Sequence, residues 1–320
     1  TEQRVDLTLF SEKIQELKDR IASVIVGQEQ TVDLVLTAIL ANGHVLIEGV
    51  PGVAKTLLAR LTARLIDADF SRVQFTPDLM PSDVLGTTVF NMKTNGFDFH
   101  QGPIFADIVL VDEINRAPAK TQAALFEVME ERQISIDGTT HRMGDLYTIL
   151  ATQNPVEQEG TYKLPEAQLD RFLMKITMDY PSLEEEVNIL ERHHTNAALV
   201  KLDDITPAIT KEELLSLRAF MNQVFVDRTL LQYIALIVQQ TRTSKAVYLG
   251  ASPRASVAML QSSKAYALLQ GRDFVTPEDI KFVAPYVLQH RLILTAEAEM
   301  EGYSPVKVTQ RLIDKVEVPK

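Results

Sequence analysis

Apolar and polar positions follow two different patterns along this chain of 320 residues. In the first half, short runs of consecutive apolar residues alternate with segments in which apolar residues recur every three or four positions. The first pattern is typical of strands buried on both faces, and the second is typical of amphipathic helices. We predict strands at residues 44–48, 72–75, 108–112, 146–151 and 172–178. This alternation predicts an α/β fold with a five-stranded parallel sheet covered by helices on both faces.

Two segments interrupt the alternation of strands and helices. TTVFNMKTNGFDFHQ contains an Asn95-Gly96 pair, and RQISIDGTTHRM contains an Asp137-Gly138 pair. Both pairs favour tight turns between antiparallel strands, because Asn, Asp and Gly tolerate the positive φ that such turns require. We therefore predict two β-hairpins that project from the sheet.

The pattern changes after Pro181, where strand-like runs vanish and helical periodicity continues into the C-terminal region. Ser252 and Thr276 each precede a proline and are expected to cap helices there. We expect an α/β domain over residues 1–181 and a smaller all-α domain over residues 182–320. The predicted helices of the second domain include residues 211–224, 227–243, 253–270 and 277–287.

The stretch GVPGVAKT at residues 49–56 lies between a predicted strand and a predicted helix. It matches the phosphate-binding pattern GxxxxGK[ST], except that Ala54 replaces the second glycine. If this position is left-handed, alanine costs about 1–2 kcal/mol, which a bound phosphate and Mg²⁺ can offset. An ordinary strand-to-helix turn is the alternative. The residues expected to contact a nucleotide here are Gly49, Val50, Pro51, Gly52, Val53, Ala54, Lys55, Thr56 and Leu57.

Two further predicted strands deliver polar residues to their carboxyl ends, where open α/β sheets bind ligands. DIVLVDEINRAP ends a strand with Asp112 and Glu113, and YTILATQNP places Asn154 after another strand. Asp112 could hold Mg²⁺ through water, and Glu113 could polarise a water for attack on a γ-phosphate. The Asn154 amide could contact that phosphate and the water. The structural alternatives are that the acids cap the next helix and that Asn-Pro starts a turn.

Two arginines are candidates for contacts with nucleotide phosphates. In LPEAQLDRF, Arg171 could offset transition-state charge in a neighbouring subunit, which would raise the rate of phosphoryl transfer about 10³–10⁵-fold. Alternatively, Arg171 could form an ion pair with Asp170 or Glu166. An exposed pair of that kind contributes only about 0–1 kcal/mol. In ASPRAS, Arg254 opens a helix of the second domain and could reach back to the nucleotide, or it could be solvated. The residue types alone leave both choices open.

Composition narrows the classes of function. The chain has no cysteine, which excludes disulfides, thiolate metal sites and thiol catalysis. The six histidines form no HExxH pair, and the adjacent His193 and His194 should point apart on a helix. The longest apolar runs are shorter than the roughly 18 residues that cross a bilayer, and no signal-peptide pattern is seen, so we expect a cytoplasmic protein. The net charge of −11 disfavours nucleic acid as a partner.

Six motifs occur in the order and approximate spacing of the MoxR family of AAA+ ATPases, which the chain resembles from Ile25 to beyond Arg254. They are GVPGVAKT, VQFTPDLMPSDVLG, LVDEINRAP, ATQNP, EQEGTYKLPEAQLDRF and SPRA. The resemblance implies a P-loop AAA+ αβα sandwich followed by an all-α lid domain, with ATP, its product ADP, and Mg²⁺ as ligands. Ala54 looks typical of this family.

The resemblance also implies roles for the residues of the phosphate loop and the strand ends. Lys55 and Thr56 look like the phosphate and magnesium contacts. Asp112 resembles the magnesium-binding acid, and Glu113 the catalytic base. Asn154 resembles the first sensor.

Further roles follow from the same resemblance. Arg171 resembles the finger that serves a neighbouring subunit's ATP, and Arg254 resembles the second sensor. Val26 and Gly27 occupy the stretch that borders adenine. Gln74 resembles a polar switch facing the catalytic glutamate.

The resemblance implies a ring of copies, commonly a hexamer, that remodels or activates a client protein complex with a partner bearing a von Willebrand factor A domain. The two hairpins resemble family insertions near the ring pore. Our leading hypothesis is a Mg²⁺-dependent ATPase whose hydrolysis moves the lid against the core. One alternative is a DNA-handling motor or initiator, which the acidic charge and the lack of a helix-turn-helix sequence oppose. Others are a non-hydrolysing switch or scaffold and a P-loop small-molecule kinase.

Overall fold

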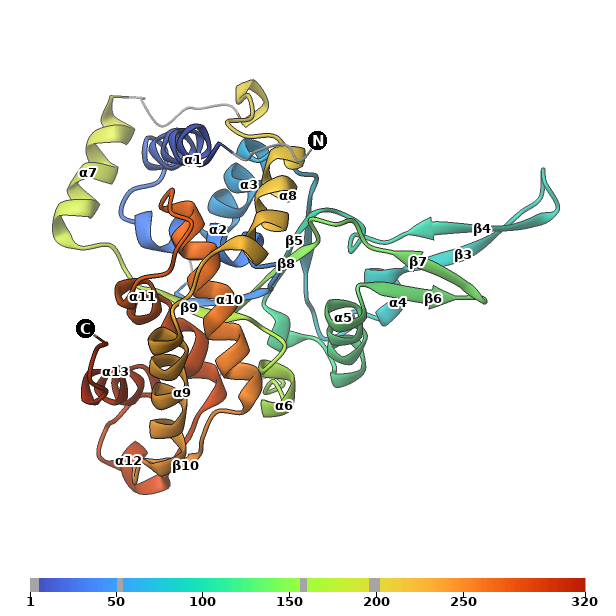
Figure 1. Cartoon of the computed structure of the whole chain (residues 1–320). Coiled ribbons are helices and arrows are strands. Elements are labelled where there is room, and N and C mark those ends of the chain that lie inside the picture. The colour runs from blue at the N-terminus through green and yellow to red at the C-terminus, as the bar shows by residue number, and fades with distance from the viewer. Residues whose placement is uncertain (1–5, 51–53, 156–159, 196–201, 320) are drawn as a thin grey trace.

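A parallel sheet of five strands, in the order β2-β5-β8-β1-β9, forms the centre of the protein (Figure 1). The structure is a computed structural model that describes residues 6–50, 54–155, 160–195 and 202–319. The strands are β1 (Val45–Gly49), β2 (Phe70–Gln74), β5 (Ile108–Asp112), β8 (Thr148–Gln153) and β9 (Met174–Met178). All their pairings are parallel. The predicted fold class is confirmed, with strand bounds shifted by no more than about two residues.

Neighbouring residues along each strand enter different hydrophobic cores, because side chains alternate between the two faces of a sheet. Val45 and Ile47 of β1 join a core formed with the first three helices and much of the second half of the chain. Leu46 joins a second core formed with α5. The helices of this first part are α1 (Leu7–Ala22), α2 (Glu29–Leu40), α3 (Lys55–Leu65), α4 (Pro81–Leu85), α5 (Ala119–Glu131) and α6 (Glu166–Leu169).

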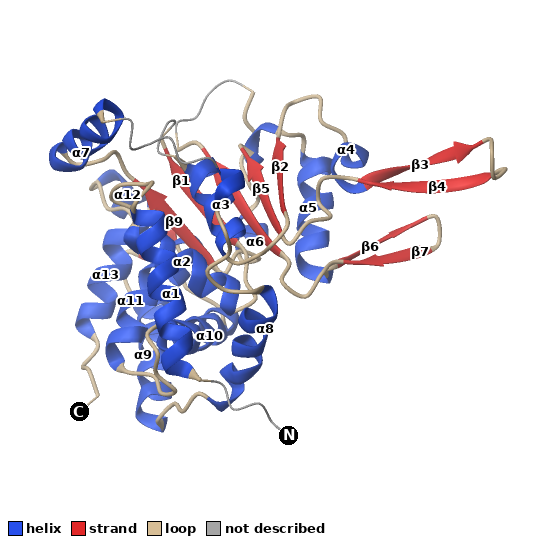
Figure 2. Ribbon diagram, turned by 90° about the horizontal axis from the view of Figure 1, so that it is seen from above, coloured by secondary structure: helices blue, strands red, loops and turns tan. Residues whose placement is uncertain are grey.

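Both predicted hairpins are confirmed and extend away from the sheet (Figure 2). The turn residues Asn95 and Asp137 have φ values of 50° and 51°, as the sequence pairs predict. The Thr88 hydroxyl of the first hairpin donates to Asp137 Oδ2 of the second at 2.6 Å, so the two hairpins are tied together. The strands are β3 (Gly86–Asn91) with β4 (Gly96–Gln101), and β6 (Gln133–Ile136) with β7 (Thr139–Arg142).

The second half is helical apart from a short antiparallel pair, β10 (Val247–Leu249) and β11 (Ile293–Leu294). The predicted capping positions are confirmed, since Ser252 and Thr276 are N-caps of α10 and α11. Thr276 forms a capping box with Asp279, whereas the Ser252 side chain makes no cap hydrogen bond. The helices are α7 (Leu183–His194), α8 (Lys211–Phe220), α9 (Arg228–Thr243), α10 (Pro253–Leu269), α11 (Pro277–Leu288), α12 (Ala296–Met300) and α13 (Pro305–Lys315).

The two halves of the chain share one hydrophobic core. α10 packs against α2, and α11 packs against β9, so that Leu268 and Ile47 belong to the same buried cluster. Lys211 Nζ adds a polar tie, because it donates to both carboxylate oxygens of Asp107 at 2.7 and 2.8 Å. The division of the chain between residues 181 and 182 stays a prediction, and the shared core crosses it.

A buried histidine joins three elements where β1 begins. His44 Nδ1 accepts a hydrogen bond from the Ile149 N–H of β8 at 3.0 Å. Its Nε2 lies 2.9 Å from the Met129 carbonyl oxygen of α5, to which it donates. Burial, followed by the nearby charge of Arg132, lowers the pKa of His44 from 6.5 to about 3. The imidazole is therefore neutral throughout the physiological range.

Acidification should destabilise the fold through His44. Unfolded His44 takes up a proton near pH 6.5, whereas the folded residue resists protonation down to about pH 3. The stability that depends on the neutral ring is fully present above pH 6.5 and is lost as the pH falls toward 3. At pH 5 the loss from this group is about 2 kcal/mol. Urea unfolding at pH 7 and pH 5 measures this loss of unfolding free energy. The His44→Gln side chain does not titrate, so this variant should lose less stability between the two pH values than the unaltered chain.

Candidate active site

Three neighbouring strands bring polar residues to one edge of the sheet. Ala151 of β8 lies opposite Val111 of β5 on one side and opposite Leu46 of β1 on the other. All three strands run in the same direction, so the segments that follow Gly49 and Asp112, and the end of β8, emerge beside one another. This edge is where open α/β sheets bind ligands.

The phosphate loop contains a left-handed alanine. Ala54 has φ 59° and ψ 28° and is the N-cap of α3, which begins at Lys55. Glycine reaches this conformation without strain, which explains why the general pattern has glycine here. At Gly49, an added Cβ would lie 2.7 Å from the Met178 carbonyl oxygen of β9, so this position has no room for a side chain. The predicted contacts Pro51, Gly52 and Val53 lie outside the described residues.

The Lys55 ammonium lies close to both predicted acids. Its Nζ donates to the Gly49 carbonyl oxygen at 3.0 Å. Burial lowers the pKa of Lys55, and the negative charges of Asp112 and Glu113 partly oppose that shift. The lysine of the loop and the two strand-end acids therefore form one electrostatic cluster.

Asp112 is buried at the end of β5 and has two hydrogen-bond partners that the sequence did not reveal. The Thr152 hydroxyl of β8 donates to Oδ1 at 3.2 Å. Arg72 Nε of β2 donates to Oδ2 at 2.5 Å. Gln74, expected to face Glu113, lies opposite Asp112 in the sheet register, and its Oε1 is 3.5 Å from Arg72.

Glu113 adopts a left-handed backbone conformation, with φ 54° and ψ 52°. Its N–H donates to the Thr152 hydroxyl at 3.0 Å, so one hydroxyl joins both acids. Its Oε2 accepts from Arg116 at 3.0 Å, within the 3-10 helix that follows β5. A non-glycine residue in this region costs roughly 1–3 kcal/mol, and such strain is concentrated at functional sites. Asn154 follows the end of β8 at the same edge and is partly buried.

A cavity of about 270 Å³ adjoins the start of α3. Val26, Ala54 and Leu57, all predicted nucleotide contacts, lie in its wall. Gly27 beside it has φ 75°, which favours glycine. The remaining lining residues, which sequence reasoning missed, are Val24, Ile25, Gln28, Pro181, Ile189, Arg192 and His193. The apolar wall and its position beside the phosphate loop suit a purine base.

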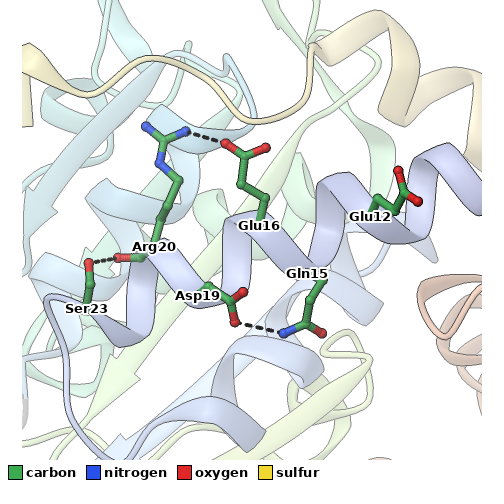
Figure 3. Close-up of a pocket in the computed structure, with 6 residues that line it drawn as sticks. All are labelled: Glu12, Gln15, Glu16, Asp19, Arg20 and Ser23. Atoms are coloured by element: carbon green, nitrogen blue, oxygen red, sulfur yellow. Dashed lines mark hydrogen bonds and ion pairs between the residues drawn. The ribbon is translucent and has the colours of Figure 1, made fainter.

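A larger hollow lies on the outer surface of α1 and is shown in Figure 3. Glu12, Glu16 and Asp19 supply three carboxylates to it, against the single cation Arg20. Arg20 is itself engaged by Glu16 at 3.5 Å and by the Thr206 carbonyl oxygen at 2.7 Å. Because carboxylates repel phosphates, this hollow does not suit a nucleoside triphosphate.

The two arginines lie away from the phosphate loop of their own chain. Arg171 precedes β9 at its amino end, a strand length of roughly 15 Å from the loop edge. Its ion-pair partner is Glu130 of α5, and not Asp170 or Glu166 as the sequence suggested. Arg254 instead lies 3.7 Å from Asp170 Oδ2, at the same end of β9. Asp170 is held in turn by Arg291 Nε at 2.7 Å.

Comparison with known proteins identifies the family. The model of the ATPase family associated with various cellular activities (AAA) matches residues 44–174, and the AAA lid domain matches residues 239–314. The chain is 47% identical to the uncharacterized protein YeaC of Bacillus subtilis, over 94% of this chain and 93% of that one. It is 44% identical to the chaperone MoxR1 of Mycobacterium tuberculosis, over 94% and 81% of the two chains. The chain belongs to the MoxR family of AAA ATPases.

A solved structure agrees with this membership. The crystal structure of a Cytophaga hutchinsonii protein superposes on this MoxR-family chain with a TM-score of 0.90 at 40% identity. The match covers 98% of this chain and 97% of the other. The predicted family and the ATPase activity are thus shown, and an AAA ATPase binds ATP. The AAA match extends from the start of β1 to the start of β9, and includes the left-handed Ala54 and the strand-end acids.

The oxygen ligands of this MoxR-family site suit Mg²⁺. Asp112 offers a carboxylate and Thr56 a hydroxyl in the first turn of α3, and Mg²⁺ commonly takes one or two protein oxygens together with substrate phosphates. Within the part of the chain that the structure describes, no group of three or more His, Asp or Glu side chains could hold a metal on its own. Likewise, no helix in the described ranges is long and apolar enough to cross a membrane.

Replacing Ala54 by glycine should stabilise the MoxR-family fold without nucleotide. The change removes about 1–2 kcal/mol of strain from the left-handed backbone. Glycine also stabilises the unfolded chain by about 0.5–1 kcal/mol through its greater conformational entropy, so we expect the free energy of unfolding to rise by about 0.5–1 kcal/mol. Chemical unfolding measures it. Ala123→Gly, at an exposed interior position of α5, is the matched control and should lose about 1 kcal/mol. An equal loss in both variants would contradict the strain at residue 54.

Proposed function

We propose that this MoxR-family protein hydrolyses Mg²⁺-ATP at the carboxyl edge of its sheet. The observation that carries the proposal is that Lys55, which begins α3 directly after the left-handed Ala54, interacts with the charges of both Asp112 and Glu113. Lys55 would neutralise the phosphates, while the N–H groups at the start of α3 point toward them. Two acids beside the lysine supply the metal-binding and water-activating groups that phosphoryl transfer to water requires.

Thr56 and Asp112 would hold Mg²⁺, which when bound offsets the negative charge of the phosphates. Asp112 Oδ2 accepts a hydrogen bond from Arg72, so the guanidinium and the metal hydration shell would compete for this oxygen. Oδ1 is oriented by the Thr152 hydroxyl and would keep the carboxylate in place during the exchange.

Glu113 would orient a water and accept its proton. The Thr152 hydroxyl fixes the backbone of Glu113 in its left-handed conformation, which directs the carboxylate away from the strand. Arg116 pairs with Oε2 and would have to share this oxygen with the water. Asn154, after the neighbouring strand, would donate from its amide to the γ-phosphate and help to position the water.

The base of ATP would occupy the cavity of about 270 Å³ beside the loop. Val26 and Leu57 would contact the purine faces, and Ile189 of α7 would close the cavity from the second half of the chain. Arg192 anchors α7 there, because its guanidinium donates to the Ala22 carbonyl oxygen at 2.9 Å. We further propose that residues 1–181 act as the nucleotide-binding core and residues 182–320 as the lid domain.

Arg171 would act on the nucleotide of an adjacent copy, since it lies at the amino end of β9. Arg254, expected from the sequence to reach back to its own nucleotide, lies beside Asp170 at the same end, so we propose that it too acts on the adjacent copy. Such sharing requires a ring, for which we propose a hexamer. The chaperone name of one relative favours a role in remodelling a client protein complex. The motifs shared with the MoxR family are the support for our proposal of a partner with a von Willebrand factor A domain. Exposed apolar side chains near the first hairpin turn, Phe90, Met92 and Phe97, would contact the client.

Glu113→Gln should separate binding from hydrolysis. The amide cannot accept the proton of water, so we expect kcat to fall about 10²–10⁴-fold while ATP affinity stays within a few fold. Phosphate release and binding of a fluorescent ATP analogue measure the two quantities. Glu131→Gln, an exposed position at the end of α5, is the control and should leave both unchanged. Unaltered hydrolysis by Glu113→Gln would reject the base assignment.

A mixture of two inactive variants should recover activity if Arg171 serves an adjacent copy. An Arg171→Ala subunit keeps its own Lys55, and a Lys55→Ala subunit can supply the missing arginine. Each variant alone should lose about 10³-fold or more of its turnover. Steady-state hydrolysis by a verified mixed assembly should exceed the sum of the two parents. Mixed assemblies as inactive as their parents would argue against sharing.

A further inference from the structure

The segment that carries Arg171 is held by a short helix of the lid. The 3-10 helix Gln289–Arg291 follows α11 and contacts α6 and β9. Its first residue donates a side-chain N–H to the Lys175 carbonyl oxygen. Its second, His290, is buried and donates from Nε2 to the Phe172 carbonyl oxygen at 2.8 Å. The lid therefore fixes the chain that leads from Arg171 into β9.

Arg291, the last residue of this helix, makes the largest number of these contacts, and its side chain is only 5% exposed. Its Nε donates to Asp170 Oδ1 at 2.7 Å, and its Nη2 donates to the carbonyl oxygens of Asp170 and Phe172 at 3.2 and 3.0 Å. Its Nη1 donates to the carbonyl oxygens of Leu173 and Val287 at 3.3 and 2.8 Å. All five N–H groups of the guanidinium are thus used, four of them by the segment that contains the proposed finger.

The Asp170 carboxylate connects the same guanidinium to the second arginine. Its Oδ1 accepts from Arg291, and its Oδ2 lies 3.7 Å from Arg254 Nη1 at the start of α10. The Arg254 side chain is 74% exposed, so it stays accessible from outside the molecule. The two arginines proposed to act on an adjacent copy are therefore both linked to the buried Arg291, one through the backbone and one through Asp170.

The side chain of Arg171 is left to make exchangeable contacts. Its Nε donates to Gln168 Oε1 at 2.5 Å, and its guanidinium pairs with Glu130, which is 43% exposed. Ion pairs as exposed as this one are weak, so a nucleotide phosphate could replace Glu130. The lid thus fixes the backbone from which Arg171 extends and leaves its charged end able to move.

A role in stability alone is the alternative, because Arg291 also joins the two halves of the chain. A single ion pair would be enough to join them. A planar guanidinium with all its N–H groups engaged fixes orientation as well as distance. Orientation matters for a charge that must meet a transferring phosphate, since a displacement of about 1 Å can lower a rate about 10²-fold.

We propose that Arg291 is a positioning residue for Arg171 and Arg254. The inference rests on the proposed action of these arginines on the nucleotide of an adjacent copy. Arg291 acts only through the backbone around Arg171 and through the carboxylate of Asp170. Its loss should therefore impair hydrolysis in the adjacent subunit and leave the site of its own subunit intact.

Arg291→Lys tests the proposal in the full chain. Lysine keeps the charge but has three donors on a flexible stem and cannot reproduce the planar fork. Turnover at saturating ATP should fall about 10²-fold, while the affinity for a fluorescent ATP analogue stays within a few fold. The matched control is Arg272→Lys, since Arg272 binds the buried carboxylate of Asp279 within the second half of the chain, at 2.8 and 2.5 Å.

The control separates positioning from stability. Both variants lose a buried arginine–carboxylate contact, so both should unfold at a lower urea concentration than the unaltered chain. Arg272→Lys should nevertheless keep its turnover. Equal turnover in the two folded variants would overturn the proposal.

Mixed assemblies show in which subunit the defect acts. Arg291→Lys subunits keep their phosphate loop but misplace the finger, whereas Lys55→Ala subunits lack the lysine and supply an intact finger. Steady-state hydrolysis by a verified assembly of the two should exceed the sum of its parents. Arg291→Lys mixed with Arg171→Ala should stay at that sum, because neither supplies a well-placed arginine. Recovery with Arg171→Ala, or none with Lys55→Ala, would overturn the proposal.

A second variant covers the case in which circular dichroism shows that Arg291→Lys does not fold. Asp170→Ala removes the carboxylate shared by Arg291 and Arg254, at a side chain that is 25% exposed. It should lose turnover and show the same pattern in the two mixtures. Full turnover by Asp170→Ala, or the reverse pattern of recovery, would contradict positioning through this carboxylate.

The mixture of Arg171→Ala with Lys55→Ala keeps this inference separate from the proposed function. If that mixture recovers and Arg291→Lys behaves like Arg272→Lys, the sharing of Arg171 stands and positioning by Arg291 is wrong. If that mixture does not recover, the proposed sharing is wrong and positioning by Arg291 is rejected with it.

Discussion

The common direction of β5, β8 and β1 is the constraint on which the active site depends. Because Ala151 lies level with both Val111 and Leu46, the three strands end at the same edge of the sheet. The side chains of Lys55, Asp112, Glu113 and Asn154, which span about a hundred residues of the chain, are then brought to one edge without any long loop. The same constraint places Arg171, three residues before β9, at the opposite edge, where it pairs with Glu130 of α5 and lies away from its own phosphate loop.

The Thr152 hydroxyl links the two acids at this edge of the sheet. Thr152 accepts from the Glu113 N–H and donates to Asp112, so the two acids cannot shift independently. Glu113 and Ala54 are both left-handed, on adjacent sides of the site. Strain at these two positions is tolerated because β5 holds the chain directly before Glu113 and α3 holds it directly after Ala54. The backbone positions of the two acids are therefore set before ligand arrives, which limits the reorganisation needed for phosphoryl transfer.

The sequence predicts what depends on short segments and misses what depends on contacts between distant ones. Strand runs and the hairpin turns at Asn95 and Asp137 have local causes and were found where expected. Of the predicted phosphate loop, the left-handed backbone of Ala54 was also foreseen from its place in the motif. Arg72 reaches Asp112 from the adjacent strand β2, and Glu130 reaches Arg171 from α5, so neither partner is visible as a motif. The cavity beside Ala54 was foreseen only in part, because sequence reasoning had named Val26, Ala54 and Leu57, whereas the α7 wall is brought there by the tertiary fold.

The core that runs from α2 and β9 into α10 and α11 has a mechanical consequence. Hinging the lid away from its own sheet would expose apolar area that water penalises at roughly 25 cal/mol per Å². Lys211 and Arg291 would also have to leave the carboxylates of Asp107 and Asp170. This shared core argues against our expectation from the sequence that hydrolysis moves the lid against the core of the same molecule. Sheet and lid should instead move as one rigid unit, and the movement that follows nucleotide turnover should appear as sliding between whole protomers.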